Sequence, residues 1–138
     1  APGKTLAEAL LVPTRLYVRS LLEAFRQTEA IKALAHITGG GFPDNIPRVL
    51  PAGLGVVLDL AAIPVPAVFG WLAGLGNVAE AEMLRTFNCG IGMIVVAGAS
   101  DAGEVEAVLR AAGESPVVIG KVVEASDSRV TYTGRLSL

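Results

Sequence analysis

The sequence has few charged residues, a single cysteine and no long uninterrupted apolar run. Charged residues make up 17% of the 138 residues, and the formal net charge is −2, so there is no general case for binding nucleic acid or an anionic membrane surface. No stretch approaches the roughly 18 consecutive apolar residues that a membrane-spanning helix requires. Cys89 stands alone, which excludes an internal disulfide and favours a reducing compartment, the cytoplasm.

Hydrophobic residues, by contrast, make up 52% of the chain. Its length fits one domain that buries its own core. With so little polar surface, either this core is large or an apolar face meets another domain or subunit. The first residues contain neither Met nor the basic and apolar regions of a signal peptide. We therefore expect residues 1–138 to be one domain of a longer protein.

Apolar residues three and four positions apart predict two amphipathic helices. The first covers residues 14–27. The second follows a capping-box pattern formed by Asp101 and Glu104, and Gly113 is a suitable C-terminal stop. The two apolar stripes consist of Val18, Leu21, Leu22 and Phe25 in the first helix, and of Val105, Val108, Leu109 and Ala112 in the second.

Short apolar stretches bounded by glycine, proline and polar residues predict strands and further short helices. Because helices and strands are mixed along the chain, the fold class is α/β or α+β. The expected strands cover residues 33–38, 54–60, 92–97, 117–123 and 129–133, and the expected short helices cover residues 44–50, 67–73 and 79–84.

The most informative segment is AHITGGGFPDNIPR, residues 35–48. Three consecutive glycines can adopt positive φ angles and let a ligand approach the backbone closely. Asp44 is a suitable N-cap, and Pro47 is tolerated in the first turn of a helix. A glycine turn that leads into a helix can bind an anion through free N–H groups. His36 and Arg48 flank this turn with a titratable ring and a permanent positive charge.

Two further polar clusters accompany this segment, RTFNCGIGM at residues 85–93 and PTRLY at residues 13–17. Together the three segments closely resemble the C-terminal domain of the aminoimidazole ribonucleotide synthetase family, also called phosphoribosylformylglycinamidine cyclo-ligases. The resemblance covers nearly the whole chain, and the motif HITGGGFPDNIPR is specific within its superfamily. The sequence departs from the family pattern at Asp44, where Glu is common, and at Cys89, where Met is common.

The resemblance implies a three-layer α/β/α domain with a mixed sheet and a partial likeness to the ferredoxin-like fold. It also implies an ATP-dependent ligase of purine biosynthesis, which closes the imidazole ring of formylglycinamidine ribonucleotide after ATP activates the formamide oxygen as a phosphate ester. The family's enzyme is a homodimer that uses Mg²⁺. Its N-terminal nucleotide-binding domain, absent from residues 1–138, supplies most of the ATP site. The sequence offers no metal-ligand spacing, so nucleotide phosphates and the missing domain would carry Mg²⁺.

The resemblance assigns the catalytic role to His36, which can donate or accept a proton near neutral pH. The residues alone favour a hydrogen-bonded structural histidine at position 36, and solvated helix-end groups at Arg85, Thr86 and Asn88; the resemblance reverses the interpretation of His36. Cys89 is expected to be a packing residue. The residues expected to bind the substrate and its phosphate are Gly39, Gly40, Gly41, Asn45, Arg48, Thr86 and Asn88.

Two other kinds of function remain open at this point. The chain could be a non-catalytic ligand-binding or interaction module that uses the same fold. It could also belong to a sister enzyme that acts on another phosphorylated substrate, which would need its own glycine motif. A glycine-rich and aspartate-rich nucleotide domain upstream would favour the ligase.

Overall fold

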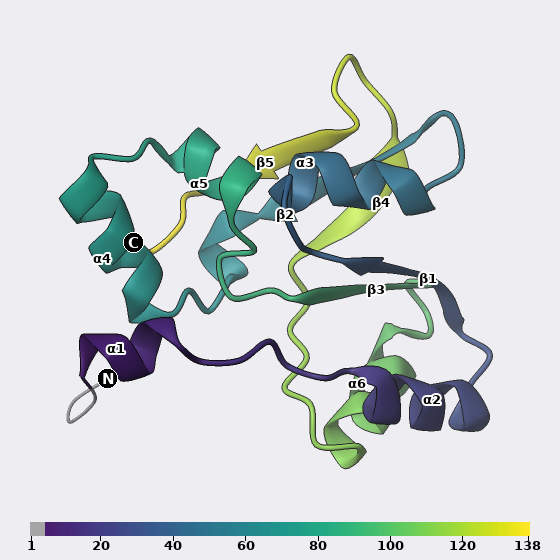
Figure 1. The fold of residues 1–138 in the computed structure, drawn as a ribbon. Coiled ribbons are helices and arrows are strands. Elements are labelled where there is room, and N and C mark those ends of the chain that lie inside the picture. Colours follow the sequence, from purple (N-terminus) through teal and green to yellow (C-terminus); the bar gives the residue numbers. More distant parts are fainter. Residues whose placement is uncertain (1–4) are drawn as a thin grey trace.

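The computed structural model describes residues 5–138, which form two small β-sheets with helices around them (Figure 1). In the first sheet, β1 (Ile31–His36) and β3 (Met93–Ala97) pair antiparallel. The second has the order β4–β2–β5 and contains β2 (Leu54–Asp59), β4 (Gly120–Glu124) and β5 (Val130–Thr133). Strand β2 is antiparallel to β4 and parallel to β5. The α/β class and the mixed sheet expected from the sequence are confirmed.

Helices α2 (Val18–Gln27) and α6 (Ala102–Ala111) lie side by side along the β1–β3 pair (Figure 1). They bury one small core against these strands. Helix α6 is followed by Gly113 with a φ of +90°, a left-handed conformation that suits glycine after a helix. The buried members of this core are Leu21, Ala24, Ala30, Val105 and Leu109, with Leu34, Met93 and Val95 of the strands packed against them.

A larger core joins the two sheets to α3 (Gly41–Asn45), the 3₁₀ helix η1 (Ile46–Val49) and α5 (Glu80–Thr86). Ala35 of β1 and Val56 of β2 belong to the same buried cluster. Helices therefore cover the strands from two sides, as expected for a three-layer domain. The largest fully buried side chains are Phe42, Ile37, Ile46, Leu60, Met83 and Cys89.

Three shorter or peripheral elements complete the described chain: α1 (Leu6–Leu10), η2 (Leu60–Ala62) and α4 (Ala67–Gly76). Helix α1 buries none of its residues, and a capping box between Thr5 and Glu8 closes its N-terminus. No helix within residues 5–138 is both long enough and apolar enough to cross a membrane.

The first amphipathic helix is shorter than the sequence predicts, because it begins at Val18 rather than at residue 14. The side chains just before it make long-range contacts instead of a first helical turn. The guanidinium of Arg15 pairs with Glu114 at 2.8 Å and donates to the carbonyl of Gly113 at 2.9 Å. The apolar stripe predicted for this helix is also oriented differently from the prediction. Only its Leu21 is buried, since Ser20 and Ala24 beside it take the inward positions.

Two other elements differ from expectation for local reasons. The helix predicted over residues 44–50 is α3 followed by η1, and it starts earlier because the glycine turn itself begins the helix. The capping box at Asp101 does not form. The backbone of Asp101 is in the αR region rather than extended. The Asp101 carboxylate accepts a hydrogen bond from the Ser100 hydroxyl at 2.9 Å.

The strand predicted over residues 117–123 is also shorter, since β4 begins only at Gly120. The backbone N–H of Asp59 still donates to the carbonyl of Ile119 at 2.7 Å. Beyond Asp59 the partner strand turns into η2 and offers no further backbone groups. Val117 and Val118 therefore stay outside the ladder, and their side chains are exposed.

An apolar face of α2, formed by Val18, Leu22 and Phe25, is open to solvent; Val18 is 66% exposed and Leu22 is 51% exposed. A contiguous apolar patch of this kind promotes association. We expect the 138-residue chain to self-associate at high concentration, and Leu22→Ser to reduce this more than Leu75→Ser on α4. Sedimentation velocity of the three proteins measures the effect, and a monodisperse wild-type monomer at high concentration would contradict it.

Candidate functional site

His36 is the last residue of β1, where it pairs with Met93 of β3. The sequence predicted that this strand would continue to residue 38, but the chain leaves the sheet after His36. The His36 side chain is exposed and is therefore not a core histidine. Its ring meets the ring of Tyr17 edge to face, with centroids 6.3 Å apart and an interplanar angle of 73°. The imidazole is thus accessible to a ligand.

The glycine turn follows directly and is closed by the backbone N–H of Gly41, which donates to the carbonyl of Thr38 at 3.0 Å. Gly40 and Gly41 have φ angles of +91° and +56°. A Cβ on Gly41 would overlap the carbonyl oxygen of Leu84 in α5, whereas a Cβ on Gly39 would meet nothing within 4 Å. The fold therefore requires glycine at positions 40 and 41, and it does not require glycine at position 39.

Asp44 does not cap a helix, in contrast to the prediction from the sequence. Gly40 occupies the N-cap position of α3, without a side-chain cap. Asp44 lies inside the short helix, and its backbone N–H donates to the carbonyl of Gly40 at 3.3 Å. The position expected to start a helix is instead in its body, because the positive φ angles of the two glycines turn the chain earlier.

Asn45 is a buried brace of the turn, with 6% of its surface exposed. Its side-chain amide donates to the carbonyls of Gly41 at 2.8 Å, Gly39 at 3.2 Å and Thr38 at 3.4 Å. Its side-chain oxygen accepts from the guanidinium of Arg48 at 3.3 Å. The structure thus places Asn45 behind the turn, while Arg48 is exposed on η1.

Arg129 on the approach to β5 holds the loop after η1, and nothing in the sequence signalled this role. Its guanidinium donates to four backbone carbonyls between η1 and the first residue of β2. Hydrogen bonds from a charged guanidinium to several carbonyls hold this segment more firmly than those of a neutral side chain would. These hydrogen bonds of Arg129 fix the backbone on both sides of Arg48. They therefore limit the positions that the Arg48 side chain can reach. The four carbonyls are those of Pro47 at 3.1 Å, Leu50 at 3.0 Å, Pro51 at 2.8 Å and Leu54 at 2.9 Å.

The loop between α5 and β3 lies beside the glycine turn because β1 and β3 are antiparallel neighbours. The backbone N–H of Ile37 donates to the carbonyl of Gly92 at 2.9 Å, which joins the two loops. The side-chain oxygen of Asn88 accepts from the backbone N–H of Gly90 at 2.9 Å, so this oxygen shapes the loop. Thr86 ends α5 and is exposed.

Cys89 is completely buried in the larger core and has a φ of +48°. Its thiol points to the carbonyl of Met83 at 3.6 Å. Burial, with a smaller contribution from the negative charge of Glu80, raises the pKa of the Cys89 thiol to about 11. The expectation of a packing residue agrees with this environment, because a neutral buried thiol is a poor nucleophile.

The raised pKa of Cys89 predicts a loss of stability in alkali. Between about pH 9 and pH 11 the unfolded chain releases the thiol proton and the folded chain retains it, so rising pH favours unfolding. Over this interval the free energy of unfolding should fall by about 2 kcal/mol more in the wild type than in Cys89→Ala. Urea unfolding at several pH values measures this, and equal slopes for the two proteins would show that the thiol does not carry the effect.

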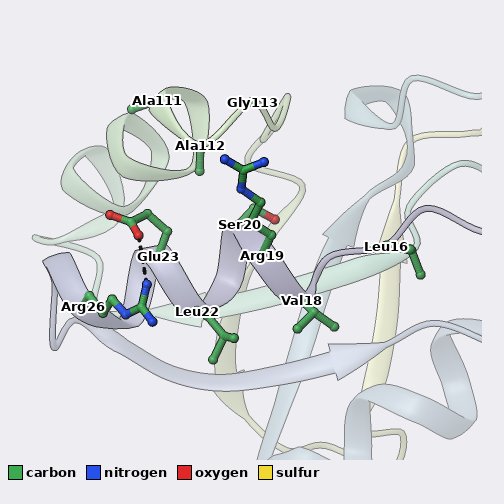
Figure 2. A pocket seen from close by; sticks show the side chains of 10 residues that line it. All are labelled: Leu16, Val18, Arg19, Ser20, Leu22, Glu23, Arg26, Ala111, Ala112 and Gly113. Atoms are coloured by element: carbon green, nitrogen blue, oxygen red, sulfur yellow. Dashed lines mark hydrogen bonds and ion pairs between the residues drawn. The ribbon is translucent and has the colours of Figure 1, made fainter.

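Two cavities adjoin the domain, and the His36 side chain lines neither of them. The first, about 950 Å³, lies between α2 and the C-terminal end of α6 (Figure 2). The second, about 740 Å³, is lined by β3, α6 and residues 114–122, and it reaches Tyr17. The glycine turn also lines neither of these cavities.

Residues 5–138 contain no group of three or more His, Cys, Asp or Glu side chains that could hold a metal ion. The donors among the exposed groups around the glycine turn are backbone N–H groups, an imidazole and a guanidinium, and the exposed carboxylate of Asp44, an acceptor, lies against Gly40. This donor set fits an anion such as a phosphoryl group. It does not fit a divalent cation, which prefers several oxygen ligands.

The fold is similar to that of a solved protein of Escherichia coli, HypE. The two chains superpose with a TM-score of 0.67 and are 22% identical over 94% of this chain. The match covers 41% of the HypE chain, so this sequence spans less than half the length of that protein. At this identity the similarity establishes a common fold and nothing more about function.

The sequence also matches a family description, "AIR synthase related protein, C-terminal domain", over residues 1–133. The match includes all three polar clusters singled out in the sequence and every helix and strand described above. The chain therefore belongs to the AIR synthase related protein family, of which it represents the C-terminal domain.

Proposed function

We propose that this chain is the substrate-side domain of an ATP-dependent cyclo-ligase that converts formylglycinamidine ribonucleotide to aminoimidazole ribonucleotide. The observation that carries the proposal is the exposed imidazole of His36 next to the open position of Gly39. Both residues belong to the motif HITGGGFPDNIPR, which resembles that of this ligase family.

The motif residues divide into two groups by what the fold demands of them. Gly40, Gly41 and Asn45 are needed to build the turn, as their φ angles and hydrogen bonds indicate. His36 and Gly39 are exposed, and packing explains neither of them. Exposed residues with no structural task, held on a rigid turn, are the natural candidates for ligand contact.

The turn also offers donors for a phosphate. Within residues 5–138, no hydrogen bond uses the backbone N–H of Gly39 or of Gly40. A Cβ added at Gly39 would meet nothing within 4 Å, whereas one at Gly40 would meet the Asp44 carboxylate, so the turn is open on the Gly39 side. The guanidinium of Arg48 provides a positive charge fixed through Asn45. We assign the binding of the substrate phosphate to this turn and to Arg48, with Thr86 and Asn88 at the margin of the site.

His36 then acts on the reacting end of the substrate. ATP supplies the phosphoryl group that activates the formamide oxygen. The imidazole can hydrogen-bond that oxygen or the transferred phosphoryl group as negative charge develops there, which lowers the barrier by electrostatic stabilisation or proton transfer. Mg²⁺ would be held by the nucleotide phosphates and by an upstream domain. That domain would also form the homodimer, in a cytoplasmic enzyme.

A titration of the 138-residue chain with formylglycinamidine ribonucleotide tests the binding role. The NMR signals of the Gly39 amide and the His36 ring should move. Arg48→Ala should weaken binding about tenfold, as for loss of one charged hydrogen bond. Lys121→Ala on β4, an exposed cation outside the motif, should leave the affinity unchanged. Binding without movement of either signal, or equal weakening by both variants, would refute the assignment.

Kinetics of the intact enzyme test the reaction itself. The proposed division of roles leaves the 138-residue chain unable to close the ring with ATP, while the intact protein turns over. Arg48→Ala should raise KM more than it lowers kcat, because a phosphate contact is made equally in the ground and transition states.

One alternative with the same fold, which the chain shares with HypE, is a sister enzyme that acts on another phosphorylated substrate. The titration separates the two functions. In a sister enzyme, formylglycinamidine ribonucleotide would move the Gly39 signal no more than inorganic phosphate does, and it would leave the His36 signal unmoved.

A further inference from the structure

We propose that Tyr17 is a positioning residue for His36, and that Glu114, after α6, fixes Tyr17 in place. The inference deepens the proposed function of the same site, because it concerns how the imidazole is oriented. It rests on a chain of contacts that links the end of α6 to the end of β1, two segments far apart in the sequence.

The first contact in this chain is between the two rings. Tyr17 and His36 meet edge to face with centroids 6.3 Å apart, an arrangement that is attractive for aromatic pairs. Within residues 5–138, no hydrogen bond involves the imidazole of His36. An exposed ring without such a partner would otherwise sample several rotamers. The Tyr17 ring therefore provides the described contact that favours one orientation.

Gly92 makes room for the tyrosine. It immediately precedes β3, and a Cβ at this position would overlap the hydroxyl of Tyr17. The tyrosine side chain consequently lies over bare backbone at the start of β3, next to the residue that pairs with His36. A larger residue at position 92 would move the ring away from the imidazole. Burial also raises the pKa of the Tyr17 hydroxyl above its usual value, so the side chain stays neutral.

The segment that carries Tyr17 is held from both sides by one carboxylate. One oxygen of Glu114 pairs with Arg15 at 2.8 Å, and the other accepts the Ser20 hydroxyl at 2.6 Å. The same hydroxyl lies 3.0 Å from the carbonyl of Tyr17, so its single proton is shared between the Glu114 carboxylate and this carbonyl. Residues two positions before and three positions after Tyr17 are thus fixed to the same side chain. This anchoring limits the movement of the tyrosine backbone relative to the sheet.

The test uses the fact that His36 is the single histidine of the chain. In the 138-residue protein, the imidazole proton signals should show a ring-current displacement from their random-coil positions. Tyr17→Leu should remove most of this displacement, and Tyr17→Phe should retain it because the ring is preserved. Phe25→Leu on the exposed face of α2 is the matched control for loss of an aromatic ring and should leave the His36 signals unchanged.

Glu114→Gln provides a second test of the positioning role, because this variant keeps the rings of both Tyr17 and His36. It weakens the anchor alone, so the His36 signals should move part of the way towards the values in Tyr17→Leu. This variant also keeps the proposal testable if Tyr17→Leu fails to fold. Unchanged His36 signals in a folded Tyr17→Leu protein, or in Glu114→Gln, would overturn the positioning role.

In the intact enzyme, Tyr17→Leu should lower kcat by roughly two- to tenfold, the range that the strength of one aromatic contact allows, with KM unchanged and with rescue by Tyr17→Phe. The spectra need no substrate and no ATP. If they respond as expected while the intact protein does not close the ring, the positioning of His36 by Tyr17 stands and the proposed reaction fails. If the protein closes the ring but Tyr17→Leu keeps full kcat, the positioning role fails by itself.

Discussion

Replacing His36 with alanine in the intact enzyme should lower kcat by roughly 10²- to 10⁴-fold, the usual contribution of one acid–base group. The substitution removes both a donor and an acceptor from the site. It should change the free energy of unfolding by only about 1 kcal/mol, because the side chain is exposed at the end of β1 and loses chiefly its contact with Tyr17.

Steady-state kinetics and thermal unfolding of the same variant separate catalysis from stability. Lys32→Ala is a matched control, since Lys32 is another exposed residue of the same strand, and it should leave kcat unchanged. If His36→Ala keeps near-normal turnover, or if it mainly unfolds the protein, His36 is a structural residue and the catalytic role is wrong.

The regular elements could be predicted where a local pattern determines them. Strand β2 was expected over residues 54–60 and covers Leu54–Asp59; β3 was expected over residues 92–97 and covers Met93–Ala97. Both are short apolar runs between glycine, proline or polar residues, and this local pattern indicates a strand. The stripe of α6 also packs as predicted, with Val105 and Leu109 buried.

Contacts between distant segments could not be predicted in this way. Arg129 binds carbonyls 75 to 82 residues earlier in the chain, and no local pattern marks an arginine for such a task. The same limit explains the start of α2. Residues 14–17 have a reasonable helical sequence, but the tertiary contact of Arg15 with Glu114 outweighs that weak preference.

The candidate site was predicted as a motif, and the roles inside the motif needed the structure. From the sequence, the three glycines were equivalent members of one anion-binding turn. Their φ angles and neighbours differ, so two of them serve the fold and one leaves the surface open. Asn45 likewise has a polar side chain of the kind that binds ligands, yet its amide donates to backbone carbonyls.

This difference among the glycines predicts two opposite outcomes for the same substitution. Gly41→Ala should reduce the free energy of unfolding by about 3–5 kcal/mol, among the largest effects of a single change. The new Cβ would overlap the Leu84 carbonyl oxygen, which belongs to backbone and cannot rotate away. The φ of +56° adds strain for any residue with a Cβ. Helices α3 and α5 would have to separate, which opens the larger core.

Gly39→Ala should leave the free energy of unfolding within about 0.5 kcal/mol of the wild type, since its Cβ would stand in open space and its φ lies outside the left-handed region. That Cβ would, however, occupy the path of a phosphate towards the turn, so KM for formylglycinamidine ribonucleotide should rise. Urea unfolding and steady-state kinetics of both variants measure the two effects. A stable Gly41→Ala protein would show that α5 can move away from the turn at little cost. A Gly39→Ala enzyme with unchanged KM would show that the ligand does not approach the turn from this side, and the phosphate would have to be placed elsewhere on the domain.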